Sequence, residues 1–164
     1  MKSISITSSV KSIGIHAFLY STKLEIISFK EYSKLTTIEE YVFYCCSNLK
    51  NMSFKNQLNL ITIANNGFHK CSKLETISYE EKSNLRIIGI YSFSYCINLM
   101  SIKLPSQLKE ISSYYNEECS KLKSIIILSN ISKIGDFSFL NCSNLECIQY
   151  FGTDEPNVSQ NAFQ

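Results

Sequence analysis

The segment "IGIYSFSYCINLMSIKLPSQLKEI", residues 88–111, decides the fold because its spacing of apolar residues returns throughout the chain. Within it Phe93 is followed three residues later by Cys96, and at further steps of three by Leu99 and Ile102. A spacing that recurs at a fixed period marks a repeat architecture, in which each repeat forms one structural unit. The number and regularity of the copies therefore determine the architecture.

Six copies of this spacing cover the chain. The phenylalanine position is occupied by Phe18, Phe43, Phe68, Phe93 and Phe139, with Asn116 in the fifth copy. The cysteine position is occupied by Cys46, Cys71, Cys96, Cys119 and Cys142, with Ser21 in the first copy. Successive copies lie 25, 25, 25, 23 and 23 residues apart, and partial copies at residues 4–6 and 161–163 extend the pattern to both ends. We expect a single repeat domain over residues 1–164, with a local irregularity at Asn116.

The period and the apolar pattern predict the fold class. A period of 20–29 residues with the pattern L-x-x-I-x-apolar is the leucine-rich-repeat signature, in which each coil has one short strand and a return segment. The expected strands are residues 24–29, 49–54, 74–79, 99–104, 122–127 and 145–150. A single coil cannot bury its own apolar face, so neighbouring coils stack. We predict an α/β solenoid of about six coils of 23–25 residues, with short parallel strands on a concave face and second short strands with helical or 3₁₀ turns on the return side.

Glycines follow the second short strand in several coils. They are Gly14, Gly89 and Gly135. Glycine adopts backbone conformations that other residues disfavour. We expect it to permit a tight bend where the chain leaves that strand.

The shared cysteine position predicts a structural role for the thiols. Free cysteine is among the residues most often buried. A position that is equivalent in every copy indicates packing between coils and not a reactive or metal-binding site. We expect the cysteines and the phenylalanines to form two buried columns. Equivalent side chains in a stack point the same way, whereas a disulfide needs β-carbons about 3.8 Å apart. Zinc needs ligands that converge on one point, and a column places them in a line. We therefore expect no disulfide and no metal site.

Two histidines and two cysteines lie outside these columns. His16 and His69 have no counterparts in other coils, so we expect both to be exposed or partly exposed on the surface. A histidine without a positioned nucleophile or carboxylate is a poor catalytic candidate. Cys45 and Cys147 are the thiols that we expect to be accessible. The chain has no glycine-rich phosphate loop or nucleophile motif, so we expect no enzymatic activity and no cofactor.

Composition and charge exclude several classes of protein. The chain is 45% hydrophobic and 18% charged, which is typical of a folded globular domain. Its net charge is +2, and its basic residues are lysines apart from Arg86, so it lacks the basic stripe of a nucleic-acid binder. No apolar run approaches the roughly 18 residues that cross a bilayer, and residues 1–10 do not form a signal peptide. We expect no nucleic-acid partner and no membrane insertion in this segment.

The repeat resembles a known family. The consensus I-G-x-x-A-F-x-x-C-x-x-L-x-x-I is carried most fully by residues 88–111 and by "IGDFSFLNCSNLECI" at residues 134–148. It is similar to the BspA-like class of leucine-rich repeats, found in bacterial surface antigens and in parasitic protists. The resemblance covers essentially the whole chain and implies a cell-surface or extracellular protein that binds host proteins or other cells. Only Pro105 keeps the family's proline after the strand.

Alternation along each strand predicts which residues face outward on the open side of the sheet. Most of them, including Pro105 and several serines, are small or polar. Four apolar ones gather in the last two coils and are Ile126, Leu128, Cys147 and Phe151. The charged ones are Lys30, Lys55, Glu80 and Lys103. We expect the apolar residues to form a contiguous area that either binds a partner or is covered by the rest of a longer chain. The charged column is either part of this binding face or a solvated surface.

These features predict a non-catalytic module that recognises a protein partner. The first hypothesis is adhesion at a cell surface, and the alternative is an intracellular scaffold of the same fold. Four glycosylation sequons, which a secretory pathway would modify, begin at Asn51, Asn130, Asn141 and Asn157. Both ends of the chain fall inside the repeat, and neither carries a visible capping repeat. We therefore expect a fragment of a longer array whose open ends favour end-to-end association.

Overall fold

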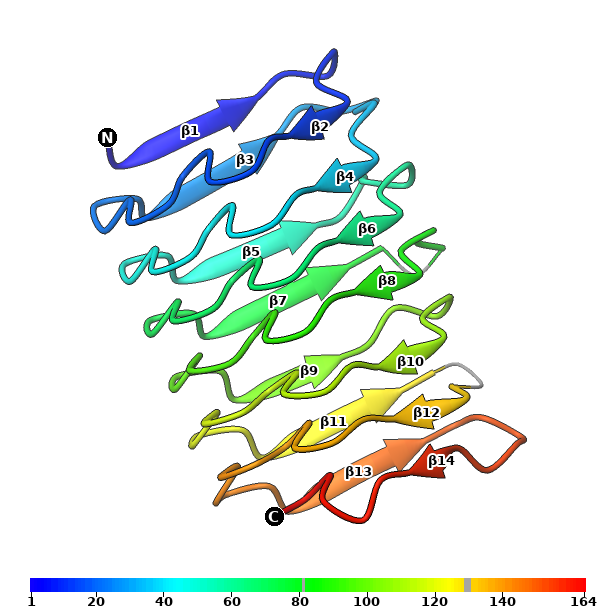
Figure 1. Ribbon diagram of the computed structural model, residues 1–164. Helices are drawn as coiled ribbons and strands as arrows, with labels where there is room; N and C mark the ends of the chain where they lie inside the picture. Colours follow the sequence, from blue (N-terminus) through cyan, green and yellow to red (C-terminus); the bar gives the residue numbers. More distant parts are fainter. Residues whose placement is uncertain (81, 129–130) are drawn as a thin grey trace.

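The computed structural model describes residues 1–80, 82–128 and 131–164. The chain winds into a solenoid of seven turns, each with one longer and one shorter strand (Figure 1). The turns stack along one axis, and the two termini lie at opposite ends of the stack (Figure 1). The predicted stack of parallel strands is confirmed. It has seven turns, whereas about six full coils were expected.

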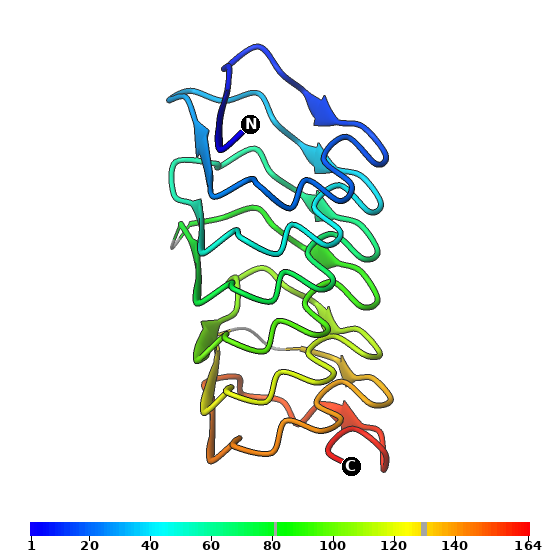
Figure 2. The same cartoon turned by 90° about the vertical axis from the view of Figure 1, so that its left-hand side faces the viewer.

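The longer strands lie along one side of the stack (Figure 1). They are β1 (Ser3–Ile6), β3 (Ile26–Phe29), β5 (Asn51–Phe54), β7 (Thr76–Tyr79), β9 (Ser101–Lys103), β11 (Ser124–Ile127) and β13 (Cys147–Tyr150). The shorter strands are β2 (Ser12–Ile13), β4 (Thr37–Ile38), β6 (Thr62–Ile63), β8 (Ile87–Ile88), β10 (Glu110–Ile111), β12 (Lys133–Ile134) and β14 (Asn157–Val158). The stack shows little curvature in Figure 2, so the side with the longer strands is flatter than the concave face expected.

Neighbouring turns pair in parallel and in register. Between β5 and β7, for example, Met52 lies opposite Ile77 and Phe54 opposite Tyr79. The longer strands form three sheets, ordered β1-β3, β5-β7 and β13-β11-β9, and the shorter strands form two, β2-β4-β6-β8 and β10-β12-β14. The break between β8 and β10 coincides with the change in repeat length from 25 to 23 residues, which shortens the loop after β9.

The core consists of columns that run the length of the stack. One column contains the fully buried leucines Leu24, Leu49, Leu74, Leu99 and Leu122. In the aromatic column the ring centroids of Phe43 and Phe68 are 5.1 Å apart, and those of Phe68 and Phe93 are 5.4 Å apart. Such ring pairs are favourable beyond the area that they bury. Each coil gives one residue to each column, so the apolar interior is continuous between coils.

The fifth coil differs from the others because Asn116 replaces the phenylalanine. Asn116 is buried, and so is the neighbouring Tyr115. The Tyr115 ring meets Phe93 edge-on, with centroids 5.3 Å apart and an interplanar angle of 73°. The irregularity expected at this coil is therefore an exchange in which an adjacent aromatic ring packs against Phe93 in a different orientation.

The return segments are runs of β-turns, so the expected helical or 3₁₀ turns were wrong. Among the described residues there is no helix. In the first coil the amide of Ala17 donates to the carbonyl of Gly14 at 3.1 Å, and His16 in this turn has a φ of 61°. Four residues later Tyr20 has a φ of 54°. Left-handed residues at this spacing interrupt the right-handed backbone that a helix requires.

The glycines after the shorter strands allow close packing of coils, which corrects the bend expected for them. None of the described glycines has a positive φ. A β-carbon at Gly89 would lie 2.5 Å from Oδ1 and 2.6 Å from the amide nitrogen of Asn65, in the preceding coil. At Gly14, in the first coil, a β-carbon would meet no atom within 4 Å. A glycine is therefore required at position 89, where the preceding coil approaches closely, but not at position 14.

Candidate partner-binding surface

The outward side chains of the longer strands form a surface that we call the strand face. Strand β5 shows the predicted alternation, because Asn51 and Ser53 are exposed while Met52 and Phe54 are buried. Polar side chains on this face form hydrogen bonds between neighbouring coils. Thr76 donates its hydroxyl to Oδ1 of Asn51 at 2.6 Å. The strand face is therefore an ordered hydrophilic surface over these coils.

A hollow of about 330 Å³ opens on the strand face beyond the carboxyl ends of β7 and β9. Lys55, Lys103 and Leu128, all expected to belong to the binding face, line it together with Glu80 and Pro105. Pro105 is buried, whereas the sequence predicted an outward position. The Glu80 carboxylate accepts a hydrogen bond of 3.1 Å from the amide of Asn56, so it is anchored to the neighbouring coil. The hollow thus combines two lysines with an apolar wall.

The other residues expected on this face do not join the hollow. Lys30 is exposed after β3. Cys147 is exposed in β13 opposite Ser124, and Phe151 follows the same strand with 63% of its surface exposed.

The expected contiguous apolar area is interrupted by polar residues. Ile126 is half-buried, and its partners in the adjacent strands are Lys103 and Gln149. Leu128 is also half-buried. The register therefore places a polar side chain on each side of Ile126, and Phe151 is largely exposed.

The column cysteines bond to the backbone of the preceding coil. Each thiol donates to the carbonyl oxygen of the residue at the phenylalanine position one coil earlier, at distances of 3.0 to 3.3 Å. The donors are Cys46, Cys71, Cys96, Cys119 and Cys142. Burial raises the pKa of Cys46 and of Cys142 to about 12 and raises that of Cys71 and Cys96 well above 9.0. These thiols stay protonated and are poor nucleophiles.

The cysteines outside the column are more accessible. Cys147 is exposed and Cys45 is half-buried. Burial raises the pKa of Cys45, and the positive charge of Lys70 partly opposes this effect. All the described cysteines are free. In the described ranges no three histidine, cysteine or acidic side chains gather where they could hold a metal ion.

His69 is buried, so the expectation that it is a surface residue was wrong. Only 9% of its surface is exposed, and its ring stacks on Tyr44 with centroids 5.0 Å apart. Tyr91 and Tyr95 contact the same imidazole from the next coil. Burial, and then the charge of Lys70, lowers the pKa of His69 to about 4. The tyrosines at neighbouring turn positions were the signal in the sequence that could have predicted this cluster.

Known proteins share the repeat and the fold. The leucine-rich-repeat protein of T. pallidum superposes with a TM-score of 0.76 at 29% identity, covering 87% of this chain and 64% of that one. A leucine-rich-repeat protein from Bacteroides ovatus has the same fold, with a TM-score of 0.52 at 20% identity, covering 96% of this chain and 65% of that one. The chain therefore spans slightly less than two thirds of either structure. A search of curated proteins finds no match.

The stacked parallel strands and continuous columns define a leucine-rich-repeat solenoid, a class whose extended surfaces serve protein interaction. A family model for BspA-type leucine-rich-repeat regions matches six copies over residues 1–84 and 62–164. The chain belongs to this BspA-type family. No helix in the described part of the chain is long and apolar enough to cross a membrane.

Proposed function

We propose that this chain is a non-catalytic recognition module that binds a protein partner through the strand face. The hollow between Lys55, Lys103 and Leu128 is the observation that carries the proposal. Protein interfaces concentrate their binding energy where one side chain fills a pocket surrounded by polar groups. The partner would insert an apolar side chain against Leu128 and place acidic residues near the two lysines.

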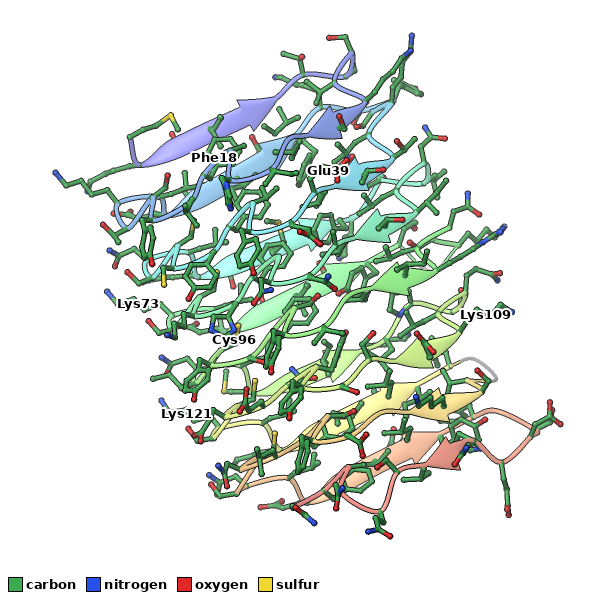
Figure 3. The ribbon with its side chains drawn as sticks, viewed as in Figure 1. Phe18, Glu39, Lys73, Cys96, Lys109 and Lys121 are labelled. Carbon is green, nitrogen blue, oxygen red and sulfur yellow. The ribbon has the colours of Figure 1, made fainter. Side chains whose placement is uncertain are left out.

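Substitutions around the hollow test this role. We expect Lys55→Glu with Lys103→Glu to weaken partner capture by about tenfold or more, because like charges would then face the acidic residues of the partner. Ile126→Glu with Leu128→Lys should have a similar effect, because Leu128 lines the hollow and Ile126 lies beside Lys103. Lys121→Glu is the matched control, since Lys121 lies at the other edge of the stack, away from the carboxyl ends of the longer strands (Figure 3). Equal capture by all variants with intact folding would disprove a role for the strand face.

We propose further that the module acts in adhesion at a cell surface, and an intracellular scaffold is the alternative. The family resemblance supports the surface role. The sequon residues Asn51, Asn141 and Asn157 are exposed, as glycan attachment requires, and Asn130 lies outside the described residues. Antibody staining of intact and permeabilised cells distinguishes the two locations. Signal that appears only after permeabilisation would end the adhesion hypothesis.

End-to-end association of the 164-residue chain is a further proposal. In the last coil Ile148, Val158 and Phe163 are 39%, 45% and 47% exposed, although equivalent residues of earlier coils are buried. An uncovered apolar end with open strand edges favours association. Sedimentation at rising protein concentration should show oligomers of the wild-type chain and a monomer for Val158→Lys with Phe163→Lys. A wild-type chain that stays monomeric would contradict the proposal.

A further inference from the structure

A row of aromatic rings runs along the side of the stack formed by the β-turns. We call this surface the turn face, and it comprises residues 14–20, 39–45, 64–70, 89–95, 112–118 and 135–141. In its first coils the ring of Tyr44 contacts Tyr41 and Tyr20, each with centroids 5.6 Å apart. Tyr44 also stacks on His69. The rings lie outside the phenylalanine column and cross from one coil to the next.

The row continues without a break through the later coils. His69 meets the rings of Tyr91 and Tyr95, with centroids 6.0 and 5.5 Å apart. Tyr91 stacks on Tyr114 at 4.7 Å, and Tyr114 stacks on Phe137 at 5.2 Å. Six of the ten tyrosines of the chain belong to this row. The turn face therefore presents a connected aromatic surface over six coils.

The turns themselves do not require these rings. Tyr41, Tyr91 and Tyr114 have φ values of 57°, 58° and 54°, a left-handed conformation that is unfavourable for bulky residues. Asn66 occupies the equivalent position in the third coil with a φ of 57°. Asparagine tolerates this conformation better than an aromatic residue does. The repeated choice of tyrosine thus points to a use of the ring beyond turn formation.

The turn face is acidic although the chain as a whole carries a charge of +2. It contains five of the fourteen acidic residues and one of the sixteen basic residues. The acidic residues are Glu39, Glu40, Glu117, Glu118 and Asp136. Figure 3 shows Glu39 between the two edges of this side, whereas Lys73, Lys109 and Lys121 lie at the edges. Apart from Lys70, the basic residues of the chain thus lie outside the turn face.

On the turn face Glu40, Glu118 and Asp136 accept hydrogen bonds from amide or hydroxyl groups, and none of the described turn-face carboxylates forms an ion pair. Glu40 accepts a hydrogen bond of 3.0 Å from Asn65, and Glu118 accepts one of 2.7 Å from Asn141. Within the described ranges the one ion pair joins Lys2 to Glu25, away from this face. Burial, and then the charge of Glu118, raises the pKa of Glu117. An added cation would relieve this excess of negative charge.

One cation of the chain already lies over a ring of this surface. The Lys70 ammonium lies 5.6 Å from the centroid of the Tyr95 ring, within the range of a cation–π interaction. His69, beneath these rings, has a pKa near 4 and is neutral at physiological pH, so it does not repel a second cation. Tyr20 and Tyr95 are 61% and 37% exposed and can receive a ligand from solvent.

We propose that the turn face binds a basic segment of a partner protein, whose arginine or lysine side chains lie over the tyrosine rings and pair with the neighbouring carboxylates. This site is separate from the strand face, so it stands independently of the function proposed there. Arginine suits such a site better than lysine, because its planar guanidinium both stacks on aromatic rings and bonds carboxylates with two hydrogen bonds.

Titration with a short oligo-arginine peptide tests this proposal. The chain has no tryptophan and six of its ten tyrosines lie in the row, so tyrosine fluorescence reports mainly on the turn face. We expect saturable quenching that weakens with added salt and no quenching by an oligo-glutamate peptide of the same length. Tyr91→Ser with Tyr114→Ser should weaken binding by about tenfold, since each cation–π contact contributes roughly 0.5 to 2 kcal/mol. Titration calorimetry on the same variants measures the affinity without relying on the deleted fluorophores.

A second variant and a control separate binding from folding. Glu117→Gln with Glu118→Gln keeps the rings and the hydrogen-bonding shape but should still weaken binding, with an unchanged thermal unfolding midpoint. Tyr32→Ser removes a tyrosine that is 89% exposed and lies outside the row, so its affinity should equal that of the wild type. No saturable binding of oligo-arginine, or equal binding by the glutamine variant, would overturn the proposal. Equal quenching by oligo-glutamate or by a neutral oligosaccharide would also overturn it.

Discussion

The thiol of Cys71 donates a hydrogen bond of 3.1 Å to the backbone carbonyl oxygen of Phe43, in the preceding coil. The same carbonyl accepts the amide of Cys46 at 3.1 Å. Both lone pairs of a buried carbonyl are thus used, one within its own coil and one between coils. Because the pairing recurs in five coils, the cysteine column stabilises the contact between successive turns.

Removing one buried thiol should weaken the stack. We expect Cys96→Ala to lower the free energy of unfolding by about 1–2 kcal/mol, because it deletes a donor to the Phe68 carbonyl and leaves a small void. Cys96→Ser should cost less, since its hydroxyl keeps a donor, as Ser21 does at this position in the first coil. Urea denaturation measures both values. Equal losses for the two variants would argue against a role for the hydrogen bond.

The buried thiols should make the protein sensitive to alkali. Their pKa is 9.0 in an unfolded chain and about 12 in the fold for Cys46 and Cys142. Above pH 9 the unfolded state loses protons that the folded state retains, so stability falls as pH rises towards 12. Urea denaturation across this range should show the decline. Cys46→Ser should reduce its slope, whereas the exposed Cys147→Ser should leave it unchanged.

The two types of glycine position should respond differently to a methyl group. Gly89→Ala should cost about 1–3 kcal/mol of stability, because its β-carbon would overlap the backbone of the preceding coil at Asn65. Gly14→Ala should be neutral or stabilising by about 0.4–1 kcal/mol, because its β-carbon meets no neighbour and alanine restricts the unfolded chain. Thermal unfolding of both variants checks this difference. A similar loss at both sites would show that glycine is needed for the bend after all.

Acid should destabilise the fold through His69. Its pKa is lowered from 6.5 to about 4 by burial among tyrosines, so the unfolded chain binds a proton that the folded protein does not. The stability that His69 contributes as a neutral group is therefore fully present above pH 6.5 and is lost as pH falls towards 4. His69→Tyr, which copies Tyr44 at the same position of the previous coil, should remove this part of the pH dependence. Denaturant melts between these pH values test it, and an unchanged profile would contradict the prediction.

The buried columns of equivalent residues could be predicted from the sequence, but the contacts of His69 and Ile126 could not. Phe68 and Cys71 recur at a fixed stride, so their burial follows from the register of the stack. His69 has no equivalent in other coils, and its burial depends on tyrosines contributed by the coils on either side. The interruption beside Ile126 likewise depends on Lys103 and Gln149, which are brought together by strand pairing.

The sequence by itself determined the repeat, the strands and the residues that fill the interior, because a period of 23–25 residues places equivalent side chains above one another in any stack. Only the tertiary structure decided the turn conformations, the close contact at Gly89, the hollow beside Lys55 and Lys103, and the aromatic row. Those features arise from contacts between different positions of neighbouring coils. A repeat pattern specifies contacts between equivalent positions and carries little information about the others.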